Sequence, residues 1–175
     1  MIKNFQWNCR EIHGKINEFR NTTCSFDIAC LQETWLGCGD SFNFSGFLTY
    51  RQDRRMNLTG GGTVILCRTN LDPSAVALVA LDGLGLEISA IVINRISLHN
   101  KKLLIMSIYR PNIHLGREGW IRFFDTMKLL SEKFSLILCG DFNTHHSSWS
   151  SSLTNPEGKI MSELLTTSDI QGEAF

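Results

Sequence analysis

Short apolar runs separated by polar or glycine-containing turns recur along the chain and predict a protein rich in β-strands. The runs have the length of strands and are enriched in β-branched, aliphatic and aromatic residues. They are Ile2 to Trp7, Phe26 to Leu31, Thr63 to Cys67, Ala75 to Ala80, Leu86 to Ile93, Leu103 to Tyr109 and Ser135 to Cys139.

Three further segments have the signals of helices. Ile12, Ile16 and Phe19 form one apolar stripe, and the aromatic-rich stripe within Glu118 to Glu132 is expected to pack on a sheet. Asn155-Pro156-Glu157 supplies an N-cap, a first-turn proline and a first-turn acid for a final helix. Strands interleaved with a few helices predict an α/β (α+β) fold.

The composition favours a single domain and limits how the chain could bind nucleic acid. The length of 175 residues and the hydrophobic content of 43% suffice for one substantial core. Lys and Arg together number 17, as do Asp and Glu, so no overall positive field attracts phosphates and any phosphate contact must be local. The densest basic stretch holds Arg51, Arg54 and Arg55, which we expect to be a solvated loop.

Cysteine usage and the start of the chain predict a soluble intracellular protein. No CxxC pair occurs, and Cys30 and Cys139 lie inside apolar runs, so we expect the cysteines to be reduced and structural. The first residues lack the organisation of a signal sequence. The longest apolar region, from Ala75 to Ile93, is interrupted by acids and glycines.

Polar side chains come at the ends of four of the apolar runs. Asn8, Glu33 and Tyr109 end or follow one run each, and Asp141 and Asn143 follow the last. If these strands are neighbours that point the same way, an acid pair, two amides and a phenol converge at one edge of the core. Each residue alone is more often a turn former or a cap than a catalyst, so the prediction depends on the set.

Taken together and in this order, the motifs resemble the endonuclease/exonuclease/phosphatase superfamily, and most of all the apurinic-type endonuclease domain of non-LTR retrotransposons. The resemblance covers nearly the whole chain. Its motifs are Gln6-Trp7-Asn8, Leu31-Gln32-Glu33-Thr34-Trp35, Gly60-Gly61-Gly62-Thr63-Val64, Ile108-Tyr109-Arg110-Pro111 and the stretch from Gly140 to Trp149 that begins Gly-Asp-Phe-Asn.

The resemblance implies a four-layer sandwich, in which two packed mixed β-sheets are flanked by helices, with the active site at one end of the sheets. It implies that Glu33 holds Mg²⁺ or Mn²⁺, since hard cations prefer carboxylate oxygen. Asp141 is implied to position or deprotonate the attacking water. Asn8 and Asn143 are implied to form hydrogen bonds around the phosphate and Asp141. Tyr109 is implied to contact the phosphate or the leaving group.

Three details allow more than one interpretation. His145 and His146 suggest a transition-metal site, but neighbours on an extended loop point in opposite directions, so we expect a structural position for one and solvent for the other. Arg10 departs from the superfamily, where an acidic or amide residue often assists the metal, and either a phosphate contact or a solvent-facing position is open to it. Gly60 to Gly62 predict a sharp turn or a close backbone approach.

Superfamily members close the active site with a Ser-Asp-His stretch on a late strand, and this tripeptide does not occur among the 175 residues. Ser168-Asp169 is followed by Ile170 and comes directly after the last predicted helix, so it is not a substitute. We therefore expect residues 1–175 to form a domain of this superfamily that is incomplete at the C-terminus and impaired in activity.

The resemblance implies metal-dependent nicking of DNA by a retrotransposon-type endonuclease. An intact element would encode a reverse transcriptase in the same polyprotein, act in the nucleus and need no membrane. One alternative keeps the fold but hydrolyses a phospholipid or inositol phosphate, which the retrotransposon-like motifs disfavour. Another is a catalytically dead, vestigial or phosphodiester-binding domain, which the absent histidine favours.

Overall fold

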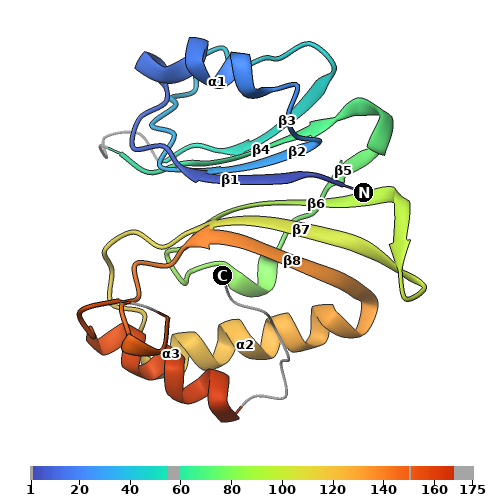
Figure 1. The fold of residues 1–175 in the computed structure, drawn as a ribbon. Coiled ribbons are helices and arrows are strands. Elements are labelled where there is room, and N and C mark those ends of the chain that lie inside the picture. Colours follow the sequence, from blue (N-terminus) through green and yellow to red (C-terminus); the bar gives the residue numbers. More distant parts are fainter. Residues whose placement is uncertain (1, 55–59, 150, 168–175) are drawn as a thin grey trace.

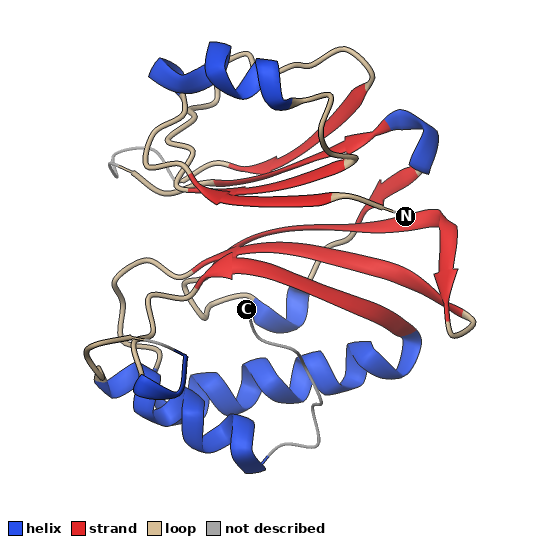
Figure 2. Ribbon diagram, in the orientation of Figure 1, coloured by secondary structure: helices blue, strands red, loops and turns tan. Residues whose placement is uncertain are grey.

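Two four-stranded sheets pack face to face, with helices on both outer sides (Figures 1 and 2). The computed structural model describes residues 2–54, 60–149 and 151–167. The expected four-layer α/β sandwich with two mixed sheets is confirmed. From one outer side to the other, the layers are α1 (Ile16–Thr22), the sheet β1-β2-β4-β3, the sheet β5-β6-β7-β8, and the helices α2 (Gly116–Lys133) and α3 (Pro156–Thr167).

The first sheet is built around a strand, helix, strand unit. Its strands are β1 (Asn4–Asn8), β2 (Ile28–Gln32), β3 (Phe47–Gln52) and β4 (Thr63–Arg68). β1 and β2 run parallel, in a register that places Asn8 beside Gln32, and α1 lies in the connection between them. β4 lies antiparallel between β2 and β3.

The second sheet repeats the parallel arrangement at its far edge. Its strands are β5 (Pro73–Ala75), β6 (Glu87–Leu98), β7 (Lys101–Tyr109) and β8 (Phe134–Asp141). β7 and β8 run parallel, with Tyr109 beside Asp141, and α2 forms the crossover between them. β6 pairs antiparallel with both β5 and β7.

Alternation along the central strands explains the layering, because successive side chains of a strand point to opposite faces. In β2, Ile28 and Cys30 belong to the core between the two sheets, whereas Ala29 and Leu31 belong to the core beneath α1. All of β2 is buried. A strand that is covered on both faces appears in the sequence as an uninterrupted apolar run.

The predicted helices are confirmed, with α2 covering the second sheet. Trp120, Phe123 and Met127 of α2 are buried in the outer core against this sheet. At the start of α3, the Asn155 side-chain oxygen accepts a hydrogen bond from the Gly158 backbone N–H at 2.7 Å, which is the N-cap that the sequence predicts.

One predicted strand is wrong, and one strand of the structure was missed. The run Ala75 to Ala80 is a strand only up to Ala75, because the chain leaves the edge of β6 there and residues Val79–Leu81 form a 3₁₀ turn. The strand Phe47–Gln52 was not predicted, because it is an edge strand of mixed polarity that leaves no continuous apolar run.

The six cysteines match the prediction that they are structural only in part. All six cysteines are free, and Cys30 and Cys139 lie in the core between the sheets, as expected. Cys24 and Cys38 are exposed and have no structural role in a core. Across the described ranges, the longest helices are too short or too polar to span a bilayer.

Candidate active site

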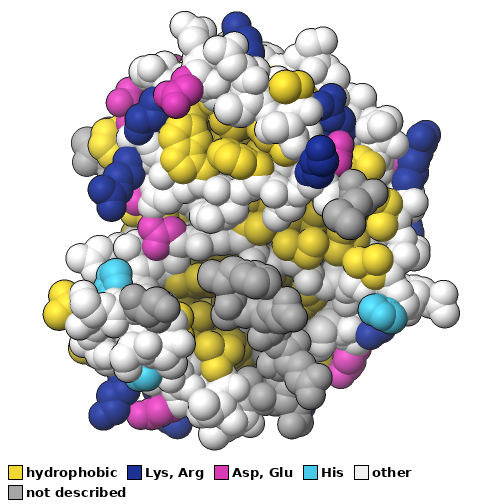
Figure 3. All heavy atoms as spheres, viewed as in Figure 1, with side chains coloured by type: hydrophobic (Ala, Val, Ile, Leu, Met, Phe, Trp, Pro, Cys, Tyr) yellow, Lys and Arg dark blue, Asp and Glu magenta, His cyan; other side chains and the backbone are white. Residues whose placement is uncertain are grey.

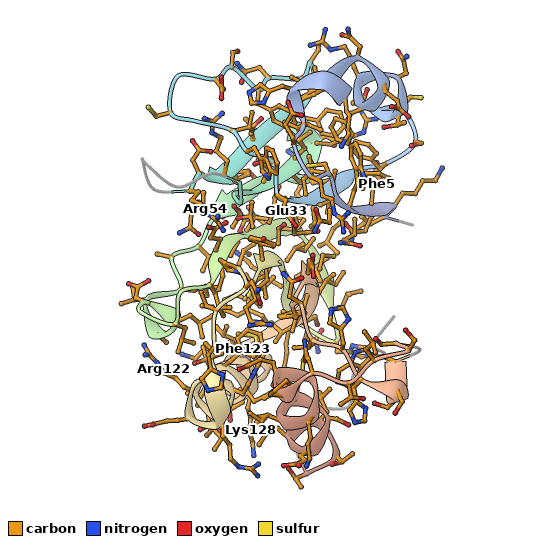
Figure 4. All side chains as sticks on the ribbon, turned by 90° about the vertical axis from the view of Figure 1, so that its left-hand side faces the viewer. Phe5, Glu33, Arg54, Arg122, Phe123 and Lys128 are labelled. Carbon is orange, nitrogen blue, oxygen red and sulfur yellow. The ribbon has the colours of Figure 1, made fainter. Side chains whose placement is uncertain are left out.

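The carboxyl ends of the two parallel strand pairs meet at one end of the sandwich. β1 and β2 end there with Asn8 and Gln32, and β7 and β8 end there with Tyr109 and Asp141. Glu33 follows Gln32 directly, and Figure 4 shows it at the level where the two halves of the molecule meet. The predicted convergence is therefore present, and each sheet supplies one strand pair. We call this end of the sandwich, with Asn8, Glu33, Tyr109 and Asp141, the rim.

A single amide connects the two acids of this rim. The Asn8 Nδ2 donates hydrogen bonds to Glu33 Oε1 at 2.8 Å and to Asp141 Oδ2 at 2.5 Å. The Asn8 Oδ1 accepts a hydrogen bond from the backbone N–H of Arg10 at 3.2 Å. This last contact turns the amide nitrogen toward the carboxylates. The side chain of Arg10 itself is exposed.

The loop after β8 is held by several hydrogen bonds around Asn143. The Asn143 backbone N–H donates to Asp141 Oδ1 at 3.0 Å, and its side-chain nitrogen donates to the Arg110 carbonyl at 2.7 Å. The Asn143 carbonyl accepts bonds from Arg110 Nη2 at 2.8 Å and from Asn155 Nδ2 at 2.9 Å. Asn143 thus orients the Asp141 carboxylate through its backbone, and the helix cap of α3 supports the same loop.

Arg110 is a buried brace beneath this loop. Its side chain is 2% exposed and also donates hydrogen bonds to the carbonyl groups of Phe142 and Ile113. Burial lowers the pKa of Arg110, and the charges of Glu157 and Asp141 partly offset this effect. A guanidinium that is bonded to backbone carbonyls in this way fixes loop geometry and has no free face for a substrate.

Tyr109 lies among the charged groups of the rim. Burial and the nearby Glu33 carboxylate raise the pKa of Tyr109, Arg54 opposes the shift, and Asp141 adds to it. The Arg54 guanidinium lies 5.9 Å from the centre of the Tyr109 ring. The phenol therefore stays protonated at neutral pH and can donate a hydrogen bond.

The basic stretch is not a solvated loop, which corrects the sequence prediction. Arg54 pairs with Glu87 at 2.8 Å, and these two side chains are only 18% and 12% exposed. Arg51 pairs with Asp53 at 2.7 Å and also donates to backbone carbonyls. Arg55 lies outside the described residues. The local sequence did not reveal the partner of Arg54, because Glu87 lies on β6, 33 residues away, whereas Asp53 is only two residues from Arg51.

The segment Gly60 to Gly62, the glycine turn, is both a sharp turn and a place of close backbone approach, the two alternatives that the sequence left open. Gly60, Gly61 and Gly62 all have φ between 76° and 86°, in the left-handed region. A Cβ on Gly61 would overlap the Arg54 guanidinium and lie 2.7 Å from a Glu87 carboxylate oxygen. The backbone therefore turns sharply and also makes room for the ion pair. The Gly62 N–H donates to Glu87 at 2.5 Å.

Non-glycine residues with positive φ cluster in the loops of the rim. Glu33 has φ of 51°, Trp35 of 57° and Asn143 of 49°. Each such conformation costs about 1–3 kcal/mol and persists only where the surroundings impose it. Here the Glu33 carbonyl accepts a hydrogen bond from Glu11 N–H at 2.8 Å, and Trp35 N–H donates to the Gly61 carbonyl at 2.8 Å.

A polar layer links the two sheets just below the rim, and sequence reasoning missed it. The Gln32 side chain is buried, accepts a hydrogen bond from Gln6 at 2.7 Å and donates one to Ser107 at 2.9 Å. The Ser107 hydroxyl donates to the Leu31 carbonyl at 2.9 Å. Gln32 and Ser107 are the polar positions within otherwise apolar strands, which was the available signal.

Cys9 is the thiol nearest in sequence to Asn8, but it is not a nucleophile. Burial raises the pKa of Cys9 to about 12, and its thiol donates to the Gln32 carbonyl at 3.1 Å. Nucleophilic cysteines need an accessible thiolate, so Cys9 serves packing.

The two adjacent histidines lie in different surroundings. His146 contacts Ser148 Oγ at 2.7 Å and packs on the Trp149 ring at 5.2 Å between centroids, whereas His145 is exposed. In the described part of the chain, no group of three or more His, Cys, Asp or Glu side chains could hold a metal ion. The contacts of His146 and the exposure of His145 agree with the prediction that one histidine is structural and the other faces solvent.

The donor set of the rim fits a hard divalent cation. Mg²⁺ in proteins is typically bound through one or two carboxylates and keeps several waters. Glu33 and Asp141 supply two carboxylates, and the second oxygen of Glu33 takes no part in the hydrogen bond from Asn8. Mn²⁺ shares this preference for carboxylate oxygen, whereas sites for Zn²⁺ or Cu²⁺ usually include imidazole nitrogen or thiolate sulfur.

An α/β sandwich with paired carboxylates at the ends of its parallel strands defines a class of phosphodiester hydrolases. The sequence model of the endonuclease/exonuclease/phosphatase family matches residues 5–173, and the chain belongs to this family. Hydrolysis of phosphodiester or phosphate bonds is the activity of its nucleases and phosphatases. No curated protein is significantly similar in sequence.

Several solved structures share the fold at low sequence identity. The endonuclease domain of TRAS1, a telomere-specific non-LTR retrotransposon, is 16% identical, with a TM-score of 0.62 over 95% of this chain and 70% of that chain. The catalytic domain of APE2 from Xenopus laevis is 17% identical, with a TM-score of 0.66 over 94% of this chain and 67% of that one. The 3′ phosphatase NExo from Neisseria, bound to a product DNA hairpin, is 16% identical, with a TM-score of 0.61 over 95% and 71%.

Proposed function

We propose that this chain is a divalent-metal-dependent phosphodiesterase that nicks DNA, as a retrotransposon-type endonuclease. The observation that carries the proposal is the Asn8 amide, which binds the carboxylates of Glu33 and Asp141 at 2.8 and 2.5 Å. Two acids from different sheets are thereby held together at the rim. Two carboxylates held close together repel each other, and a bound cation would offset this repulsion.

Glu33 would hold Mg²⁺ or Mn²⁺, and the cation would neutralise phosphate charge and polarise the phosphoryl oxygen. Glu33 suits this role because it is partly exposed and sits on a loop whose backbone is fixed on both sides. Its left-handed backbone directs the side chain out of the regular alternation of β2.

Asp141 would orient the attacking water and accept its proton. The hydrogen bonds from Asn8 and from the Asn143 backbone occupy one lone pair on each of its oxygens and fix the carboxylate plane. Each oxygen retains capacity for a further bond. The protonated Tyr109 phenol can donate to a phosphate or leaving-group oxygen, where charge develops during hydrolysis.

The choice of DNA and of a retrotransposon context is supported by relatives and motifs. TRAS1 is a retrotransposon endonuclease domain, and NExo was solved with a DNA hairpin. Basic and acidic side chains are interspersed on the face seen in Figure 3, so phosphate binding would depend on local groups. We also propose a reverse transcriptase in the same polyprotein and action in the nucleus.

A second candidate is a catalytically dead phosphodiester-binding domain. The Ser-Asp-His tripeptide is absent from the 175 residues, and Ser168-Asp169 lies outside the described residues. Loss of one member of a catalytic group that acts as a unit costs orders of magnitude in rate. Under the first proposal residues 1–175 alone cleave slowly, whereas under the second candidate they bind a phosphodiester without cleaving it.

Nicking of a supercoiled plasmid in Mg²⁺ tests the proposal. The chain should produce open circles, and Glu33→Gln and Asp141→Asn should each abolish them, while Glu132→Gln, a change of an exposed acid on α2, should not. Equal nicking by all four proteins would contradict the proposed site. Binding of a plasmid without nicking by any of them would favour the dead domain.

A further inference from the structure

We propose that Trp35 is a stacking platform for an unpaired nucleobase next to the scissile phosphate, so that the substrate is single-stranded or locally unstacked DNA. The inference rests on the proposed function and specifies its substrate class. Trp35 comes two residues after Glu33 and is 45% exposed. Among the Phe, Tyr and Trp side chains in the described part of the chain, it is the one that is exposed.

The exposure of Trp35 is imposed by the backbone. Its neighbours Thr34 and Leu36 are buried, at 0% and 3% exposure. Trp35 has φ of 57°, which is a rare conformation for a bulky aromatic residue, and its N–H is fixed to the Gly61 carbonyl at 2.8 Å. The strained backbone at Trp35 therefore holds the indole ring outward, two residues after Glu33.

The glycine turn shapes the surroundings of the ring. A Cβ at Gly60 would lie 3.2 Å from Trp35 Nε1 and 3.8 Å from Arg54 Nη1, so the indole and the guanidinium flank the same point. Arg54 also lies over the Tyr109 ring. An aromatic face, a cation and a phenol thus run along the rim beside Glu33 and Asp141. Figure 4 shows Arg54 and Glu33 at the same level of the molecule.

This combination suits a nucleotide whose base is free of its helix. Stacking on an aromatic side chain is independent of base sequence because every base has a π-face. A fully paired duplex presents no free base face at its backbone. The chain has no net charge, so affinity for a strand must come from such local contacts.

Binding of two labelled oligonucleotides of equal length tests the inference. One is oligo-dT and the other carries abasic residues throughout, which keep the phosphates but lack the bases, and Ca²⁺ replaces Mg²⁺ to slow hydrolysis. The chain should bind oligo-dT more tightly than the abasic strand. Trp35→Ala should weaken oligo-dT binding about tenfold and leave abasic binding within about twofold. Trp35→Phe should retain most of the affinity.

Val79→Ala, which alters another exposed apolar side chain at 69% exposure, is the control and should change neither affinity. Quenching of tryptophan fluorescence by oligo-dT in the unaltered chain, lost in Trp35→Phe, supplies a readout that does not depend on the Ala variant folding. Equal losses for both strands, no loss for either, or no preference for oligo-dT in the unaltered chain would overturn the inference.

The two proposals fail separately. Nicking that depends on Glu33 and Asp141, together with binding that ignores Trp35, would remove the stacking role alone. Base-dependent binding through Trp35 without any nicking would remove the proposed activity alone.

Discussion

Glu33 follows β2 and Asp141 ends β8, a strand of the other sheet, yet both accept a hydrogen bond from the same Asn8 nitrogen, at 2.8 and 2.5 Å. Neither acid contributes to the apolar core that holds its sheet together. Their proximity therefore depends on how the two sheets pack, and the rim is coupled to the core between the sheets.

Replacing Asn8 by Asp should expose this coupling. A third carboxylate removes the shared donor and adds repulsion, so the metal-free protein should melt at a lower temperature. Mg²⁺ should raise the melting temperature of Asn8→Asp by more than that of the unaltered chain. Asn21→Asp, an exposed position on α1, is the matched control and should show no such Mg²⁺ effect. An equal Mg²⁺ effect in all three proteins would contradict the account.

The polar layer should contribute measurably to stability. Gln32→Ala leaves the Gln6 and Ser107 side chains without their buried partner and should lower the free energy of unfolding by about 1–3 kcal/mol. Thr34→Val, which replaces a buried hydroxyl that has no hydrogen-bond partner among the described residues, should be neutral or stabilising. Urea denaturation of both variants measures the difference. A Gln32→Ala variant as stable as the unaltered chain would show that the layer does not hold the sheets together.

The sequence predicted β1, β2, β7 and β8 because each contains an apolar run that a polar residue or Tyr109 ends or follows. Asn8, Glu33 and Asp141 were identified from that pattern and from the family resemblance. The resemblance implied a hydrogen bond between Asn8 and Asp141, but the second bond from the same amide to Glu33 was not predicted. The ion pair of Arg54 and Glu87 was also missed, because it joins residues 33 positions apart.

Glu157 should make stability depend on pH. Burial alone would raise the pKa of Glu157, but hydrogen bonds from Trp120 and Gly116 and the charge of Arg110 outweigh it, and the pKa lies below its ordinary value of 4.5. The folded state thus favours the ionised form. This stabilisation is fully present above pH 4.5 and is lost as pH falls through the lowered pKa.

Glu157→Gln should therefore lower stability at pH 7 by about 1–3 kcal/mol and reduce the loss of stability on acidification. Glu163→Gln, which removes an exposed partner of Arg117, should change neither by a comparable amount. Thermal melts between pH 3 and pH 7 make the comparison. Parallel pH profiles for the unaltered chain and Glu157→Gln would show that this group is not responsible.

Tyr109 should act as a protonated donor over the working pH range. Its pKa is raised by burial, by Glu33 and by Asp141, so the phenol keeps its proton up to and above its ordinary value of 10.0. Tyr109→Phe should lower the nicking rate about a hundredfold, by the same factor at pH 7 and at pH 9. A rate ratio that grows as pH rises would instead indicate a phenolate.

The central claim is that Glu33 binds the cation of a phosphodiesterase and that the nearby Asp141 carboxylate strengthens the binding of this cation. Mn²⁺ binding, followed by the paramagnetic resonance signal of the free ion, tests it without requiring fast turnover. We expect the chain to bind a Mn²⁺ ion that Glu33→Gln and Asp141→Asn lose or weaken at least tenfold and that Glu132→Gln retains. Equal binding by all four proteins, or no binding by the unaltered chain, would contradict it.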